Sequence, residues 1–175
     1  MKAMAMRTAI AVVALTLLAR PAAAQESELG FGFALQNQTW NGCCGSGLTI
    51  DFARTLSSTE TRSLAVLADF SWLRHTIGAF EEQNYPIVGG IRFKFLRNRR
   101  VSLFVQGTAG VMPWKDNDPE SRTDIVFGGG GGIQVRLTGS LDARVQLDLM
   151  ADNDSGDWYR YDRLLFAGVY KFGAK

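Results

Sequence analysis

The sequence has few of the residues that build metal centres and disulfide frameworks. Its 175 residues include only two cysteines and one histidine, and the cysteines, Cys43 and Cys44, are neighbours. Structural zinc sites take four ligands, mostly Cys and His, so a metal centre is not indicated. Adjacent Cα atoms lie about 3.8 Å apart, which is closer than ordinary disulfide geometry prefers. A strained vicinal disulfide, two free thiols and a bridge to another chain therefore all stay open.

An excess of charge of one sign is also missing. The chain has 19 Lys and Arg residues against 17 Asp and Glu residues. Without Lys2, Arg7 and Arg20, which fall in the leader described next, 16 basic and 17 acidic side chains give a net charge of −1. No basic patch stands out along the sequence. A nucleic acid is therefore not expected as a partner.

Long apolar runs are absent except for one near the start. Two basic residues precede the apolar run Thr8–Leu18, and the small residues Ala22–Ala24 follow it. This order predicts a secretory signal peptide over residues 1–24, and hence export through the general secretory pathway. The run is too short for a transmembrane helix, which needs about 20 apolar residues. We expect one domain over residues 25–175.

No later segment has apolar residues at helical spacing. Instead, Leu141–Leu149 reads Leu-Asp-Ala-Arg-Val-Gln-Leu-Asp-Leu, with apolar odd positions and charged or amide even positions. Side chains alternate across a β-strand, so this segment would have one apolar and one polar face. Each run of this kind is long enough for a spanning strand of about 9–11 residues. The runs cover residues 29–39, 47–56, 64–73, 85–96, 101–112, 125–137, 141–150 and 161–172.

The connections between these runs alternate in length. Short ones cover residues 57–62, 97–100 and 138–140, whereas the intervening ones are mostly longer and polar, as at 113–124. Short turns at one end and longer loops at the other are typical of outer-membrane barrels. The sequence therefore predicts an all-β fold, an eight-stranded antiparallel up-and-down transmembrane β-barrel with both termini at the short-turn end.

Alternation alone also fits a soluble lipocalin-like barrel, whose apolar side faces inward. Two features of the faces favour the membrane orientation. The apolar face carries no charge, and a Lys or Arg facing lipid near the bilayer centre costs roughly 2–4 kcal/mol. The opposite face is rich in Gly, Ala, Ser and Thr rather than in the mixed charges of a soluble surface. Small side chains suit the crowded lumen of an eight-stranded barrel.

The aromatic residues give the third argument, because they fall into two layers. Two aromatic girdles are typical of barrels that cross a membrane. The layer expected at the long-loop end contains Trp40, Trp72, Tyr85, Trp114, Trp158, Tyr159 and Tyr161. The layer expected at the short-turn end contains Phe31, Phe93, Phe95, Tyr170 and Phe172.

The polar face carries charges of both signs, which the alternation turns into the lumen. Buried charges persist when they are paired and hydrogen-bonded, so we predict salt bridges that plug the barrel. Hairpin geometry predicts the pairs Arg136–Asp142 and Asp69–Arg92. The alternative is that some charges, Arg92 and Lys94 above all, reach solvent at the barrel mouth. The candidate residues are Asp51, Asp69, Arg92, Lys94, Arg136, Asp142, Arg144 and Asp148.

On strand number, loop asymmetry and girdles, the chain resembles the small eight-stranded outer-membrane barrels of the OmpA/OmpX type. Its final run, Leu164–Phe172, adds a closing aromatic that resembles the signal read by the barrel-assembly machinery, carried by Phe166, Tyr170 and Phe172. Three residues follow Phe172, whereas this aromatic is usually last. The resemblance implies an integral protein of the bacterial outer membrane, surrounded by lipid and lipopolysaccharide.

Three short motifs could carry chemistry, and each departs from its pattern. His75–Ile77 breaks the His-x-Ser motif of a lipid A deacylase family, so His75 is predicted to be a surface residue. Asp152–Asp157 has its glycine in fifth place and no later Glu, unlike an EF-hand, so an acidic surface turn is expected. Gly128–Gly132 lacks the Lys and Ser/Thr of a phosphate loop; it would let strands bend and other side chains occupy the lumen.

Together these features predict a non-enzymatic outer-membrane barrel that needs no cofactor and no metal. It would serve envelope structure or act as a surface interaction module. A small pore or transporter, which needs a wet lumen, is one alternative. A lipid-modifying enzyme, which would need His75 with acidic partners at the outer leaflet, is the other.

Overall fold

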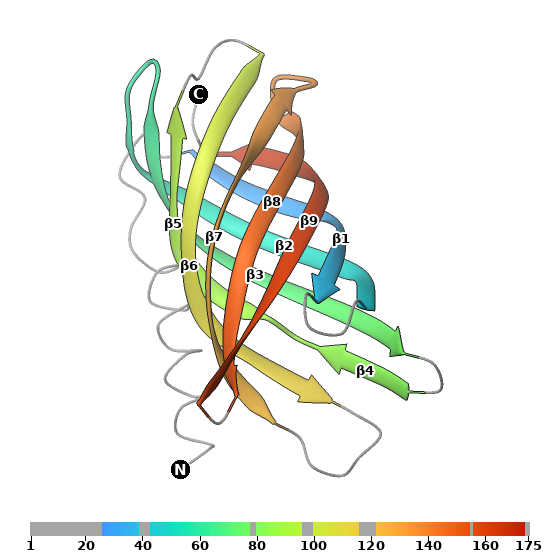
Figure 1. Ribbon diagram of the computed structural model, residues 1–175. Coiled ribbons are helices and arrows are strands. Elements are labelled where there is room, and N and C mark those ends of the chain that lie inside the picture. Colours follow the sequence, from blue (N-terminus) through green and yellow to red (C-terminus); the bar gives the residue numbers. More distant parts are fainter. Residues whose placement is uncertain are drawn as a thin grey trace.

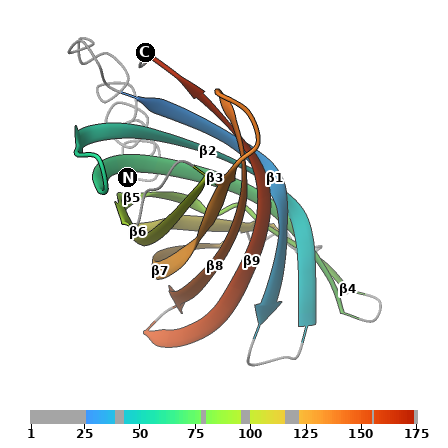
Figure 2. The ribbon, with the colours of Figure 1, turned by 90° about the horizontal axis from the view of Figure 1, so that it is seen from above.

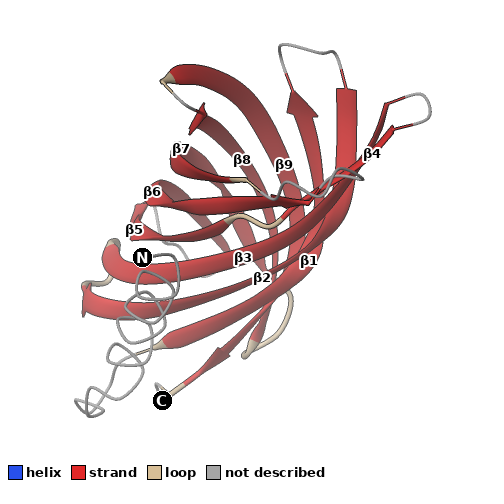
Figure 3. Ribbon diagram, turned by 90° about the horizontal axis from the view of Figure 1, so that it is seen from below, coloured by secondary structure: helices blue, strands red, loops and turns tan. Residues whose placement is uncertain are grey.

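The computed structural model describes residues 26–38, 43–77, 80–95, 100–115, 122–154 and 156–173. The predicted signal peptide, residues 1–24, and Trp40 lie outside these ranges. Almost all described residues are in strands (Figure 3). No helix in the described part of the chain is long and apolar enough to cross a membrane. The strand segments are β1 (Ser27–Gln38), β2 (Cys43–Ser58), β3 (Ser63–Ile77), β4 (Phe80–Asn84), β5 (Ile87–Phe95), β6 (Val101–Lys115), β7 (Thr123–Arg136), β8 (Leu141–Asp154) and β9 (Asp157–Phe172).

The strands form one closed antiparallel barrel, tilted and strongly twisted (Figures 1 and 2). Consecutive strands pair with each other, except β4 and β5, and β9 returns to pair with β1, with Phe172 opposite Ser27. Segments β4 and β5 both lie between β3 and β6, and together they form one strand of the wall. The barrel therefore has eight strands, which confirms the predicted fold class.

The break in the fourth strand lies at Tyr85 and Pro86, the first two residues of the predicted run 85–96, and the strand also contains β4 before that run. Proline has no N–H to donate to a sheet, so a strand is interrupted where it occurs. The backbone still bonds to both sides, since Pro86 O accepts from Ser71 N at 3.0 Å and Tyr85 N donates to Pro113 O at 2.9 Å. The wall thus stays connected across the break.

The strands extend further at the long-loop end than the sequence indicates. Segment β3 continues to Ile77, β6 to Lys115 and β8 to Asp154, and β9 already begins at Asp157. The acidic run 152–157 is therefore the tip of a β-hairpin, and Gly156 takes the left-handed φ of 108° there. Glycine adopts that conformation without steric cost.

The two faces of each strand point as predicted. On β8, Leu141, Val145, Leu147 and Leu149 are 39–55% exposed, whereas the charged residues between them are buried. Exposed apolar side chains continue around the wall, and we call this surface the apolar band. Its members are Leu29, Phe31, Phe33, Leu35, Leu48, Ile50, Leu64, Phe70, Trp72, Ile87, Ile91, Phe93, Val105, Val111, Ile125, Phe127, Ile133, Val135, Leu141, Val145, Leu147, Leu149, Phe166, Tyr170 and Phe172.

The band ends towards the long-loop end of the wall. On β2 and β3 its last members are Leu48 and Trp72, which face each other in the register. The next outward positions, Ser46 and Arg74, are exposed and polar. Residues beyond this level, including His75, therefore lie outside the apolar band.

The glycine run in β7 makes room for lumen side chains. A Cβ on Gly130 would lie 2.1 Å from Oδ1 of Asp148, and one on Gly132 would lie 2.7 Å from Cζ of Phe104. Real Cβ atoms do not approach so closely. Larger residues at these positions would displace groups that cross the lumen.

Candidate functional site: the filled lumen

A carboxylate from β2 lies at the centre of the lumen. Nη1 of Arg144 donates to both carboxylate oxygens of Asp51, at 2.7 and 2.8 Å, and Arg92 donates to the same carboxylate at 3.4 Å. Both guanidinium groups also lie over the ring of Phe104, that of Arg92 at 4.9 Å and that of Arg144 at 5.7 Å from the ring centroid. All four side chains are almost fully buried. One carboxylate thus holds together cations from β5 and β8.

The network continues towards the short-turn end through Glu28 on β1. Glu28 accepts from Lys94 and from Gln134, the latter at 3.1 Å, and lies 3.3 Å from Arg144. Gln134 also donates to Asp142 at 2.7 Å. These bonds join β1, β5, β7 and β8 across the lumen.

At the rim of this end, Asp142 pairs with Lys171 on β9 at 2.5 Å. Lys171 also lies 3.7 Å from Glu26. The pair closes the network where the last strand meets the first.

A second centre, around Arg163 on β9, lies towards the long-loop end. Its guanidinium donates to both oxygens of Asp69 at 2.8 and 3.0 Å, to Oδ2 of Asp148 at 2.8 and 3.1 Å, and to Ser71 at 2.6 Å. Gln106 links this centre to the first one. It donates to Asp148 at 3.1 Å and accepts from Arg92 at 2.9 Å.

The charges of this network balance. Its buried ion pairs involve five carboxylates and five cations, each with a side chain no more than 12% exposed. Desolvation of so many charges is tolerable only when each is paired and hydrogen-bonded. The carboxylates are Glu28, Asp51, Asp69, Asp142 and Asp148, and the cations are Arg92, Lys94, Arg144, Arg163 and Lys171.

The structure buries seven of the eight predicted lumen charges but pairs them differently. The exception is Arg136, which lies opposite Asp142 in the register yet is exposed, because it comes at the last position of β7. The predicted pair Asp69–Arg92 is also wrong. Asp69 binds Arg163, and Arg92 binds Asp51, because long side chains reach across the lumen rather than along the wall. The alternative that Arg92 and Lys94 reach solvent is wrong as well, since they are 1% and 7% exposed.

Sequence reasoning missed Glu28, Arg163 and Lys171, although the alternation contains the signal. Glu28 has the inward parity of Gly30 but lies one residue before the predicted start of the first strand. Arg163 and Lys171 have the inward parity of Ala167 within the predicted last strand. Extending the strand by one residue and applying its parity throughout would have found all three.

His75 is fully buried in the lumen, so its prediction as a surface residue is wrong. Its strand runs past the predicted end, and the inward parity of Ser71 and Leu73 carries it inside. Its Nε2 lies 3.2 Å from Nδ2 of Asn84, and its ring centroid lies 6.4 Å from that of Trp114. Burial lowers the pKa of His75, which favours the neutral ring.

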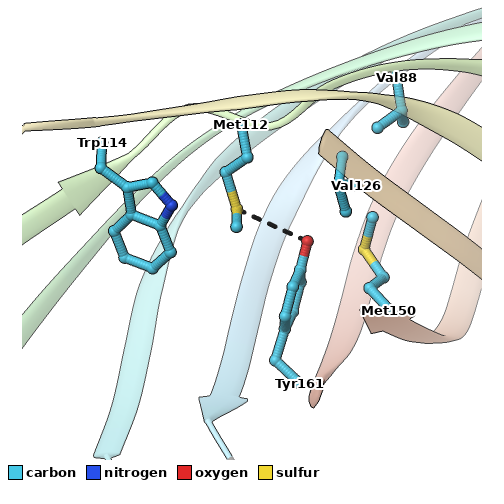
Figure 4. Packing of buried hydrophobic residues seen from close by; sticks show 6 residues of the cluster. All are labelled: Val88, Met112, Trp114, Val126, Met150 and Tyr161. Carbon is cyan, nitrogen blue, oxygen red and sulfur yellow. Dashed lines mark hydrogen bonds between the residues drawn. The ribbon is translucent and has the colours of Figure 1, made fainter. Parts of the chain in front are cut away.

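Two members of the predicted long-loop girdle also face inward. Trp114 is 4% exposed and Tyr161 is 3% exposed, and both belong to a buried apolar cluster (Figure 4). The hydroxyl of Tyr161 donates to Sδ of Met112 at 3.6 Å. Trp114 lies beyond the predicted end of its strand, on a continuation whose alternation turns it into the lumen. Tyr161 is the first residue of the predicted last strand and has the inward parity of Ala167, so the alternation itself places it inside. The remaining members of the cluster are Val88, Val126 and Met150.

The other girdle positions differ in exposure. Trp72 and Trp158 point outward and are 45% and 57% exposed, whereas Tyr85 and Tyr159 are half-buried. At the short-turn end, Tyr170 and Phe172 are exposed and stack with centroids 6.1 Å apart. The rings of the exposed Phe93 and the half-buried Phe95 stack at 6.3 Å.

Two carboxylates meet near the long-loop end. Asp124 and Asp152 are both buried and interact with each other. Arg122 lies 3.4 Å from Asp124 and over the ring of Trp114 at 4.6 Å. Asp152 lies opposite Val126 in the register, between the outward band residues Ile125 and Phe127.

Metal and thiol chemistry find little support in the described residues. They contain no group of three or more His, Cys, Asp or Glu residues that could hold a metal ion. Cys44 on β2 has a free, exposed thiol. Of the states left open by the sequence, the structure therefore has a free thiol at Cys44.

Comparison of the sequence with protein-family profiles and with curated proteins found no match. Solved structures, in contrast, match over most of the chain. Neisserial surface protein A has a TM-score of 0.66 at 12% identity, over 87% of this chain and all of its own. Ail of Yersinia pestis, in complex with the heparin analogue sucrose octasulfate, has a TM-score of 0.63 at 16% identity, over 85% of this chain and 99% of its own.

The outer membrane enzyme PagL is also similar, with a TM-score of 0.55 at 12% identity, over 82% of this chain and 98% of its own. Identities this low show the fold alone. The fold is therefore that of the small eight-stranded outer-membrane barrels, as the resemblance to the OmpA/OmpX type predicted. These neighbours include both an enzyme and a protein solved with a bound ligand, so the function has to be argued from the site.

Proposed function

We propose that the chain is a non-enzymatic integral protein of the bacterial outer membrane whose lumen is plugged by its own side chains. The charge-balanced network between Asp51, Arg144 and Arg163 carries this proposal. Its bonds span strands that are not neighbours, so they occupy the space that a pore would need. The apolar band gives the outer surface that a bilayer requires. Its partners are lipid, lipopolysaccharide and the barrel-assembly machinery, which would read Phe166, Tyr170 and Phe172.

The biological role that fits a closed barrel is envelope structure or surface interaction at the long-loop end. The similarity to Ail, solved with a heparin analogue, favours the second of these. The lipid-modifying alternative loses its candidate residue, because His75 is buried on the lumen side of the wall. An acyl chain in the outer leaflet would lie on the other side.

Conductance in planar bilayers tests the plug. We expect no steady channel from the wild-type chain. A variant with Asp51→Ala, Asp69→Ala, Arg144→Ala and Arg163→Ala lacks the cross-lumen ion pairs of both centres and should conduct, which controls for insertion. A steady conductance from the wild type would overturn the plug. Fractionation of cells, with protease shaving of intact cells, tests the location: cleavage should be confined to the long-loop end.

A further inference from the structure

Four buried polar side chains form a layer in the lumen at the long-loop end. We call Gln36, His75, Asn84 and Trp114 the mouth layer; each is at most 4% exposed. Five of their polar atoms have no hydrogen-bond partner in the described structure: Oε1 and Nε2 of Gln36, Nδ1 of His75, Oδ1 of Asn84 and Nε1 of Trp114. In the ion-pair network every charged group is bonded to another, although Oδ1 of Asp142 and Nε of Arg144 also have no partner there.

The four residues follow one another along the inner wall. Gln36 lies opposite Gly45 in the register of β1 and β2, and Gly45 lies opposite His75 in that of β2 and β3. A Cβ on Gly45 would lie 2.2 Å from Cε1 of His75, so the imidazole packs on the lumen side of the glycine that separates it from Gln36. Asn84 bonds to His75 and lies opposite Trp114. The unpartnered atoms therefore belong to one continuous row.

The row offers hydrogen bonds of both kinds and no formal charge. An amide nitrogen only donates, so Nε2 of His75 accepts from Asn84, and the proton of the neutral ring sits on Nδ1. Nδ1 of His75, Nε1 of Trp114 and Nε2 of Gln36 are then three free donors. Oδ1 of Asn84 and Oε1 of Gln36 are two free acceptors.

An apolar surface borders this polar row. Trp114 belongs to both, because its ring also lies in the buried cluster with Met112 and Tyr161 (Figure 4). Below the row, Arg163 is fully engaged by Asp69 and Asp148 and supplies no free charge. Binding sites for small molecules combine such an apolar lining with a few polar groups that fix orientation.

We propose that the mouth layer binds a neutral ligand rich in hydroxyl groups, a sugar residue, which reaches it from the long-loop end. Each hydroxyl both donates and accepts, which matches the mixed set of free atoms, and the apolar face of a sugar ring would contact Trp114. Unpartnered buried polar groups destabilise a fold, so a bound ligand would supply what the protein leaves unbonded. The four residues carry no cation, and Arg122, which lies over the ring of Trp114 at 4.6 Å, is already paired with Asp124.

Titration with simple sugars tests the proposal. The probes are D-glucose, D-galactose and N-acetyl-D-glucosamine, added to the full chain folded in a detergent without sugar head groups. A variant with Trp40, Trp72 and Trp158 changed to Phe leaves Trp114 as the reporter of tryptophan fluorescence. Calorimetry on the wild type gives a second readout that needs no substitution. We expect at least one probe to bind with a Kd of about 1–10 mM or tighter.

Two glutamine variants separate a binding role from a structural one. Gln36→Leu should weaken sugar binding about tenfold and leave the urea midpoint unchanged or higher, because it removes unpartnered atoms. Gln134→Leu, the matched control, should leave binding unchanged and lower the midpoint, because Gln134 bonds to Glu28, Lys94 and Asp142. Glucose 6-phosphate should bind more weakly than glucose. Absence of binding by all three sugars, or binding that Gln36→Leu leaves intact, would overturn the proposal and mean that water fills the layer.

The inference rests on the proposed function in one respect: the plug would close the lumen below the layer, so a ligand would enter from the long-loop end. The two experiments fail separately. Sugar binding in a barrel that conducts would contradict the plug but support the site. A barrel that neither conducts nor binds sugar would contradict the site and support the plug.

Discussion

Asp51 and Arg144 bond directly across the lumen, at 2.7 and 2.8 Å, although β2 and β8 are not neighbours in the wall. The two residues are 93 positions apart in the sequence. Arg163 and Asp69 make a similar bond between β9 and β3. The lumen is therefore held by contacts that tie opposite parts of the barrel together, in addition to the ladder of backbone hydrogen bonds.

Removal of one partner should expose the cost of the buried charge. We expect Arg144→Met to lower the free energy of unfolding by about 3–5 kcal/mol, because it leaves Asp51 and Glu28 with fewer cations. Urea unfolding of the folded barrel, followed by tryptophan fluorescence, measures this. The exposed Arg136→Gln is the control and should change stability by less than about 0.5 kcal/mol. Equal effects of the two variants would contradict the ion-pair assignment.

Two glycines should respond oppositely to the same substitution. Gly130→Ala should destabilise the barrel by about 1–3 kcal/mol, because the new Cβ would lie 2.1 Å from Oδ1 of Asp148. Gly107→Ala should be neutral or slightly stabilising, since nothing lies within 4 Å of its Cβ. Urea midpoints compare them. A tolerated Gly130→Ala would show that Asp148 has room to move.

Quenching by lipid should separate the tryptophans that face outward from the one that faces the lumen. Single-tryptophan variants in vesicles of brominated lipid should lose fluorescence strongly for Trp72 and Trp158, which face outward. Trp114 should be quenched little, because it is 4% exposed and faces the lumen. Strong quenching of Trp114 by the brominated lipid would place it in the girdle after all.

Alternation predicted most of this fold, because the register of a strand leaves each residue only two directions. It placed Asp142, Arg144 and Asp148 inside and their apolar neighbours outside, and eight strands followed from counting the runs. It failed where strands run on beyond the apolar band. There the outward positions turn polar, as at Arg74, and the contrast between the faces disappears although the strand continues.

That failure explains the candidate site. Two of its residues, His75 and Trp114, lie beyond the predicted ends of their strands, and Tyr161 lies at the start of one. Each was therefore assigned to a loop or to a girdle. The pairing of the lumen charges was beyond the sequence for another reason. Register fixes neighbours along the wall, whereas Arg163 and Arg92 choose partners by reach across the interior, which depends on barrel diameter and side-chain length.

The lumen network also bears on the order of folding. The ion pairs Glu28–Arg144, Asp51–Arg144 and Asp69–Arg163 join the first three strands to the last two, so they form only when β9 meets β1. Until then the sheet is open, and its charged face is in contact with water. Closure thus dehydrates these charges in one late step, with contacts of long sequence separation, which form slowly. The ion pairs must be broken again before the barrel opens, so they slow unfolding and make the folded protein long-lived.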